Sequence, residues 1–199
     1  YVYEPLFVYI ASTGQYLPRL GRSFTESPDG RELTVRLRPG SRWHDGTPAT
    51  SRDVQCTFYL GALRAMPVWS YLESVDCPDD GTVVFRFRKP SPLARVDALT
   101  EPVTSPCHIF GQHLPAVLEI GGARVAGVEA SQDPGLQESL RAVREVLFRF
   151  HPDLPVGTGP FRIGRVTSAE MSLSAFPQHP QADRLRVRRV RLLRWGSNE

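Results

Sequence analysis

Two segments with alternating apolar residues constrain the fold of this chain most. The sequences RELTVRLR and TVVFRFR each follow a turn made of proline, aspartate and glycine, and the two segments close at a basic residue followed by proline, Arg38-Pro39 and Lys89-Pro90. The residues expected on one side of the two segments are Leu33, Val35, Leu37, Val83, Phe85 and Phe87. A period of two is typical of a strand with one buried face. We therefore expect two half-buried hairpin strands. The similarity between the two segments is local and does not indicate a solenoid repeat.

A capped helix is expected between these two strands. Thr50 can cap its first turn, and Asp53 can accept a hydrogen bond from the amide of the cap residue, which is the spacing of a capping box. The apolar side of the helix is carried by Val54, Phe58, Gly61 and Ala65. The helix should run to about Ala65, because Pro67 cannot continue it.

Weaker signals predict two further helices. A short helix should begin near Ser91-Pro92, since proline in a first turn costs no hydrogen bond. An irregular run to Pro115 and a loop over 120–135 should follow. An amphipathic helix that ends before His151 is predicted by the spacing of Leu136, Leu140, Val143 and Leu147.

Both ends of the chain are expected to contain strands. Segment 1–10 is interrupted by Pro5, and therefore fits an edge strand or a short helix–strand junction. Segments 161–166 and 171–176 predict a hairpin, and segment 185–195 predicts a third strand. The doubled arginine at 188–189 breaks the alternation of that strand and predicts a bulge.

Composition places the chain among ordinary globular proteins. Hydrophobic residues make up 41% and charged residues 23% of its 199 residues. The formal charge of +3 is too mild to argue for nucleic-acid binding. No stretch approaches the roughly 20 apolar residues that cross a bilayer. The three cysteines lack a CxxC pair, which leaves open one disulfide with a free thiol or three buried thiols.

Several residue groups resemble reactive sites, but the pattern favours a structural role for each. His44 and Asp45 are adjacent, so their side chains rarely face one another, and no nucleophile is placed by spacing. The segment 157–160, GTGP, lacks the lysine of a phosphate loop, and its proline removes an amide, so a tight turn is expected. Cys107, His108 and His113 lack a fourth metal ligand. We expect no catalytic residue, metal or cofactor.

Segment 184–194 is the part of the chain in which basic residues cluster. Apolar residues alternate with its arginines, and stacking aromatics are absent apart from Trp195. A strand with a solvated arginine face is the simpler interpretation, and we expect no nucleic-acid partner for this segment.

Four blocks in a fixed order resemble a known protein family. They are YEPL, then LPRLGRSFTESPDGRELTVRLRPGSRWHDGTPATSRDV, then DDGTVVFRFRKPSP, then PVGTGPFRI. In this order the chain is similar to the extracellular solute-binding protein family 5, which includes oligopeptide, dipeptide and nickel binders. The resemblance covers Tyr3 to about Trp195 and is weakest over 111–150.

The resemblance implies a fold and a division of the chain. The fold would be a mixed α and β lobe of the type II periplasmic-binding architecture, incomplete, with the second lobe absent. Residues 1–16 would start the main lobe, residues 17–150 would form an inserted α and β subdomain, and residues 151–199 would return to the sheet of the main lobe.

The same resemblance implies a function without catalysis. The chain would be part of a monomeric receptor outside the cytoplasm, periplasmic or lipid-anchored, that captures a peptide or similar solute between two lobes and delivers it to the permease subunits of an ABC importer. Trp69 and Tyr71 are the candidate solute contacts, with packing in the core as the alternative for both. A second hypothesis is the sensing domain of a cytoplasmic transcription regulator, which the residues preceding Tyr1 in the natural gene would distinguish.

Overall fold

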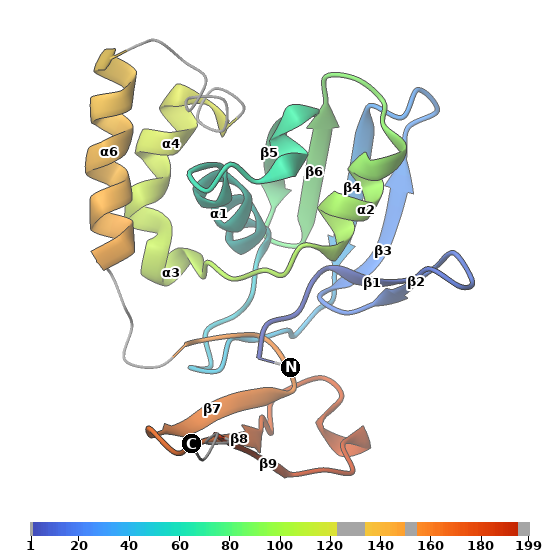
Figure 1. Ribbon diagram of the computed structural model, residues 1–199. Coiled ribbons are helices and arrows are strands. Elements are labelled where there is room, and N and C mark those ends of the chain that lie inside the picture. The colour runs from blue at the N-terminus through green and yellow to red at the C-terminus, as the bar shows by residue number, and fades with distance from the viewer. Residues whose placement is uncertain (1, 123–133, 150–154, 195–199) are drawn as a thin grey trace, which may run out of the picture.

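The largest sheet of the molecule is the one against which the helices pack. The computed structural model describes residues 2–122, 134–149 and 155–194. Within these ranges the strands form three antiparallel sheets, and the helices gather on one side of the four-stranded sheet (Figure 1). The mixed α and β fold that the sequence indicated is confirmed.

Four strands form this central sheet. In spatial order they are β3 (Gly21–Glu26), β4 (Glu32–Leu37), β6 (Thr82–Phe87) and β5 (Leu72–Asp79). The register places Val35 between Phe24 and Val83, so these three side chains share the inner face. Leu33, Val35, Val83 and Phe85 are fully buried, which confirms the predicted inner face. The predicted half-burial is not met in β6, where Thr82 and Val84 on the other face are buried too.

Helices cover the inner face of the central sheet. Helix α1 (Ser51–Ala62) packs on β5 and β6, and α2 (Pro92–Thr100) packs on β1 (Phe7–Ile10) and on the 3-10 helix η1 (Pro67–Ser70). Beyond α1 lie α3 (Cys107–Phe110), the 3-10 helix η2 (Gly111–His113), α4 (Leu114–Ile120) and α6 (Pro134–Arg149) (Figure 1). The largest side chains buried between these layers include Trp43, Phe58, Trp69, Phe85 and Leu99.

Both predicted helix caps are present. The amide of Thr50 donates to Asp53 Oδ2 at 2.7 Å, as expected for the capping box. At the start of α2 the hydroxyl of Ser91 accepts from the amide of Leu93 at 3.3 Å. The run after α2 is irregular over 101–106, as predicted, but the prediction is wrong beyond it, where α3 and η2 follow. Pro115 itself lies in the first turn of α4, where its missing N–H is tolerated. Most of the predicted loop over 120–135, residues 123–133, lies outside the described residues.

The end of α1 explains why it stops before the predicted residue. The amide of Ala65 donates to the carbonyl of Ala62 at 2.9 Å, and the amide of Met66 donates to the carbonyl of Gly61 at 3.4 Å. These are the two hydrogen bonds of a Schellman motif, with Ala65 in the left-handed position at φ 53°. Ala65 therefore belongs to the cap and not to the apolar side of the helix.

Replacing Ala65 with glycine should stabilise the protein by about 1 kcal/mol, because the left-handed conformation costs an L-residue roughly 1–2 kcal/mol and glycine gives back part of this as entropy of the unfolded chain. Urea unfolding of the full-length protein measures the change. The matched control is Ala62→Gly, one turn earlier inside α1, which should destabilise by about 1 kcal/mol. An Ala65→Gly variant that is less stable than wild type would contradict the assignment.

Two smaller sheets complete the fold. β1 pairs with β2 (Gln15–Pro18), and within the described residues it has no other strand partner, which confirms an edge strand in segment 1–10. At the other end β7 (Phe161–Val166), β8 (Glu170–Ala175) and β9 (Arg189–Leu193) form a sheet in that order, so the predicted hairpin is confirmed.

The third strand of the C-terminal sheet differs from the prediction at its start. It begins at Arg189 and not at Leu185, because the 3-10 helix η4 (Ala182–Arg184) precedes it and Arg188 reaches back to the carbonyl of Ala182 at 3.2 Å. The predicted bulge at 188–189 is wrong, since the doubled arginine stands where the strand starts. The register shift of this sheet lies instead in β7, around Gly164. The predicted end at Trp195 lies outside the described residues.

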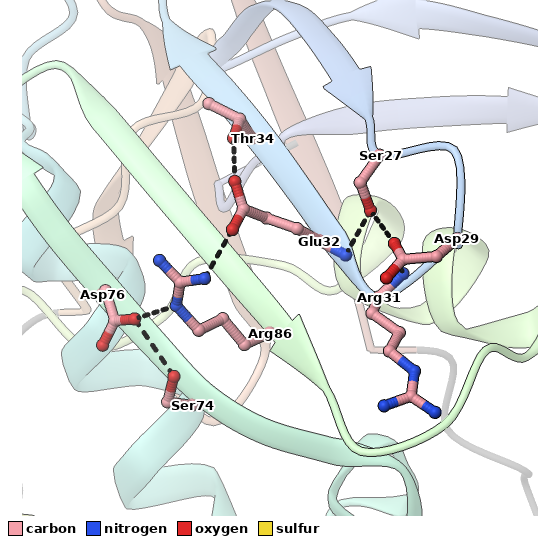
Figure 2. A network of polar contacts seen from close by, with 8 residues as sticks. All are labelled: Ser27, Asp29, Arg31, Glu32, Thr34, Ser74, Asp76 and Arg86. Atoms are coloured by element: carbon pink, nitrogen blue, oxygen red, sulfur yellow. Dashed lines mark hydrogen bonds and ion pairs between the residues drawn. The ribbon is translucent and has the colours of Figure 1, made fainter.

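The outer face of the central sheet is covered by a ladder of polar side chains (Figure 2). Arg86 of β6 binds Glu32 of β4 at 2.5 Å and Asp76 of β5 at 3.0 Å, so one guanidinium joins three strands. All three side chains are about half exposed, and such pairs contribute little to stability. Because the guanidinium of Arg86 is already paired with a carboxylate on each neighbouring strand, the ladder stabilises the strand register and leaves no free positive charge on Arg86 for a solute.

Candidate functional site

Trp69 lies in the core of the molecule. Only 1% of its surface is exposed, and its ring lies 5.0 Å from that of Tyr59. The indole N–H donates to the carbonyl of Phe58 on α1 at 2.9 Å. A Cβ added at Gly122 would lie 2.1 Å from the indole ring, so the chain passes directly over it. A direct contact between Trp69 and a solute stays a prediction, and the burial favours a packing role.

Tyr71 lies two residues further along, at the start of β5, and faces α2. Its hydroxyl donates to Asp97 Oδ2, and its ring lies 6.3 Å from that of Phe87. Burial, together with the hydrogen bond to the Asp97 carboxylate, raises the pKa of Tyr71 well above its usual range. The phenol is therefore a fixed donor to Asp97 and is not available as a base.

Arg88 joins the two candidate residues through their backbone. Its guanidinium donates to the carbonyl of Trp69 at 2.6 Å, and its amide donates to the carbonyl of Tyr71 at 2.9 Å. Burial raises the pKa of Glu101, the residue that follows the last turn of α2. We call Trp69, Tyr71, Arg88 and Asp97 the Tyr71 group.

Two members of the Tyr71 group were not found by sequence reasoning. Asp97 lies inside a predicted helix and Arg88 at the end of a predicted strand, and neither position carries a motif. The group offers hydrogen-bond donors, acceptors and an aromatic surface, but no nucleophile next to a base. Its chemistry suits binding and not covalent catalysis.

The residues considered as metal ligands take other partners. His108 Nε2 lies 2.7 Å from Asp45 Oδ2, while the Nε2 atom of His113 lies 3.2 Å from the side-chain amide of Gln112. Within the described ranges, no three histidine, cysteine or acidic side chains are arranged to hold a metal ion.

His44 connects the central body to the C-terminal sheet. The amide of Gly157 donates to His44 Nδ1 at 3.2 Å, so the proton of the ring resides on Nε2, which donates to the carbonyl of Gly159 at 2.9 Å. The amide of Gly159 in turn donates to the carbonyl of Val2 at 2.8 Å. His44, for which the sequence favoured a structural role, thus holds the glycine-rich turn in place.

A second histidine closes the same junction. His179 Nδ1 accepts from the amide of Gln181 at 3.1 Å, which leaves Nε2 to donate to Glu4 at 3.2 Å. Both side chains are buried. The start of the chain is therefore fastened to the segment that follows β8, although 175 positions separate the two residues.

Comparison with known proteins identifies the family. A sequence model of the bacterial extracellular solute-binding proteins, family 5 Middle, matches residues 15–192. The chain belongs to this family. The resemblance carried by the four sequence blocks is confirmed.

Relatives of this family 5 chain are longer proteins. A putative ABC transporter peptide-binding protein of Brucella ovis is 30% identical over 194 residues, which are 92% of this chain and 31% of the relative. An oligopeptide-binding protein of Thermotoga maritima, solved with bound mannohexaose, superposes with a TM-score of 0.67 at 25% identity, over 98% of this chain and 32% of that one. The chain spans about a third of the length of these relatives.

A more distant structure shows the fold alone. The oligopeptide-binding protein AppA of Bacillus subtilis, solved with a nonapeptide, has a TM-score of 0.61 at 20% identity, over 89% of this chain and 31% of that one. The family 5 chain therefore has the fold of part of a type II periplasmic binding protein, as the resemblance implied. None of the helices in the described part of the chain is long and apolar enough to cross a membrane.

Proposed function

We propose that this chain is part of the substrate-binding component of an ABC importer, which captures a peptide or peptide-like solute between two lobes and passes it to permease subunits in the membrane. The family match over residues 15–192 carries the proposal, and the names of the relatives from Brucella and Thermotoga support it. The component would act outside the cytoplasm, free in the periplasm or lipid-anchored, as a monomer and without enzymatic activity.

The mechanism that we propose is hinge closure. A solute stabilises the closed form because both lobes contact it only there, and this differential contact is what shifts the population. The chain described here would supply one side of the cleft. The chain 1–199 by itself should therefore bind peptides negligibly, and micromolar binding by this chain in calorimetry would argue against a shared cleft.

We propose that the lobe boundaries follow the expected division, with residues 1–16 and 151–199 in the main lobe. The hydrogen bonds from Gly159 to Val2 and from His179 to Glu4 support this, because they fasten both segments together. In the C-terminal sheet, Val166 and Leu192 flank Met171 on one apolar face, and each is 52% exposed. We expect the rest of the main lobe to cover this face in the full-length protein.

Two of the six arginines of segment 184–194 have partners within the chain, which supports our proposal that this segment has no nucleic-acid partner. Arg191 of β9 binds Glu170 of β8 at 2.5 Å, and Arg188 donates to a backbone carbonyl. Paired arginines on a strand offer less free charge to a phosphate backbone than an unpaired basic surface does.

Within this function we propose that Tyr71 lies against the solute, fixed by Asp97, and that Trp69 supports it from the core.

The full-length protein should first be purified and analysed by native mass spectrometry for a co-purified solute, and the affinity for that solute then measured by calorimetry. We expect Tyr71→Phe to weaken binding by up to about tenfold, because the ring would lose the bond to Asp97 that holds it in position against the solute, and a hydrogen bond to a charged group is worth about that factor. Tyr9→Phe is the matched control, because Tyr9 is 38% exposed in β1.

The possible results of this experiment distinguish the proposed transport function from the proposed solute contact at Tyr71. If no peptide or other solute is bound by the full-length protein, the proposed function is wrong. If a solute is bound and Tyr71→Phe binds it as tightly as wild type, the function stands and the assignment of Tyr71 is wrong.

A further inference from the structure

Helix α1 and the segment leading into α3 are held side by side by three hydrogen bonds. Thr57 Oγ1 accepts from the two backbone amides of segment 104–105, at 3.2 and 3.0 Å. One turn earlier on α1, Asp53 Oδ1 accepts from the amide of Cys107 at 2.6 Å. The segment therefore runs along α1 from Thr57 toward Asp53, and α3 begins against the helix (Figure 1).

This arrangement brings two cysteines together. Cys56 follows Asp53 by three residues, so both side chains lie on the side of α1 that faces Cys107. The Cys56 thiol lies beside that of Cys107, close enough for the two side chains to shift each other's pKa. Cys56 is completely buried, whereas Cys107 is partly exposed. A reagent in solution can thus reach Cys107 but not Cys56.

The third cysteine has a different environment. Cys77 lies on β5 beside Ser51, whose hydroxyl at the start of α1 donates to the carbonyl of Asp79 at 2.6 Å. Cys107 affects the pKa of Cys77 through its charge alone, whereas Cys56 is among the groups that shift the pKa of Cys107, and Cys77 is not. Of the three cysteines, Cys56 and Cys107 are therefore the pair that lies on packed helices and interacts at short range.

We propose that Cys56 and Cys107 are an oxidisable pair that forms a disulfide between α1 and α3, with Cys77 remaining a free thiol. With oxidised glutathione as the oxidant, the Cys107 thiolate attacks one glutathione sulfur, which forms a mixed disulfide and releases one glutathione thiol. The Cys56 sulfur then attacks the sulfur of Cys107, which forms the protein disulfide and releases the second glutathione thiol. Two protein thiols are oxidised, and one glutathione disulfide is reduced to two thiols.

Burial sets the rate of this reaction. It raises the pKa of Cys107, so little of the reactive thiolate exists at neutral pH, and the first step should accelerate as the pH rises. Because Cys56 is enclosed, it acts second, as the resolving thiol. The bond would close a loop from α1 to α3 in the unfolded chain, and should raise the melting temperature by about 10 °C.

The full-length protein, first reduced and then incubated with oxidised glutathione at pH 8.5, tests this pairing. Peptide mapping by mass spectrometry without reduction should show the peptides of Cys56 and Cys107 joined, and the peptide of Cys77 alkylated. The Cys56→Ser variant should stop at a glutathione adduct on Cys107, and the Cys107→Ser variant should gain no adduct on Cys56. Cys77→Ser is the control and should form the bond as wild type does.

Other results would overturn the proposal. A bond between Cys77 and Cys107, a glutathione adduct on Cys56, or three alkylated cysteines after prolonged oxidation would each show that the pair is wrongly assigned. The test is made in vitro and does not depend on the proposed transport function.

Discussion

Replacing Trp69 with alanine should lower the free energy of unfolding by about 3–5 kcal/mol, the range found when a buried tryptophan is removed from a core. The indole is buried between α1 and the chain at Gly122, and the variant would leave a cavity there. It would also leave the carbonyl of Phe58 without its donor. Urea unfolding of the full-length protein, followed by circular dichroism, measures the loss.

Trp69→Phe is the matched variant for this prediction. It keeps an aromatic ring in the core but removes the indole N–H, so it should cost less than alanine. The comparison also decides between two roles for Trp69. If Trp69→Ala keeps the stability of wild type and loses only solute affinity, Trp69 is a solute contact and our placement of it in the core is wrong.

Replacing His44 with alanine should destabilise the protein by about 2–4 kcal/mol at pH 7.5, because the amide of Gly157 and the carbonyl of Gly159 would both lose a partner in a partly buried junction. Urea unfolding measures this change as well. His113→Ala is the matched control, since His113 is half-buried and its ring contacts the side chain of the adjacent Gln112, and it should cost about 1 kcal/mol or less.

The same histidine should make the stability of the protein depend on pH. Burial, aided by the positive charge of Arg162, lowers the pKa of His44 below its ordinary value of 6.5. Between that value and the lower pKa of the folded state, the unfolded chain binds more protons than the folded chain does. The contribution of His44 is therefore fully present above pH 6.5 and falls as the pH drops toward the folded pKa.

The difference between wild type and His44→Ala isolates this contribution from other acidic transitions. We expect the stability gap between the two proteins to be constant above pH 7 and to narrow as the pH is lowered to 5. A gap that widens on acidification would mean that the ring is charged in the folded state, which contradicts the acceptor role of Nδ1 toward Gly157.

Sequence reasoning succeeded where the signal lies within a few residues. The strands containing Leu33 and Phe85 were predicted from a period of two, and the start of α1 from the three-residue spacing between Thr50 and Asp53. Strand β3 was not predicted, because Phe24 is the single large apolar residue among its six. It forms because its neighbour β4 offers a row of backbone groups to pair with.

The Tyr71 group shows the limit of such reasoning. The sequence singled out Trp69 and Tyr71 by their type and by resemblance to a family, but left open whether they line a cleft or pack a core. Burial of Trp69 depends on how α1 and the chain at Gly122 pack over it, and the bond from Tyr71 to Asp97 depends on how α2 docks beside η1. Neither arrangement has a signature in the local sequence.

The sequence by itself determined the elements of this protein and its family, because periodicity, caps and motif order are written in neighbouring residues. Only the tertiary structure decided which distant residues meet. It joined His44 to a turn more than a hundred positions away, His179 to Glu4, and Cys56 to Cys107. These contacts form when whole helices and strands pack together. They are stabilised by the folded core as a unit and not by the residues of any one segment.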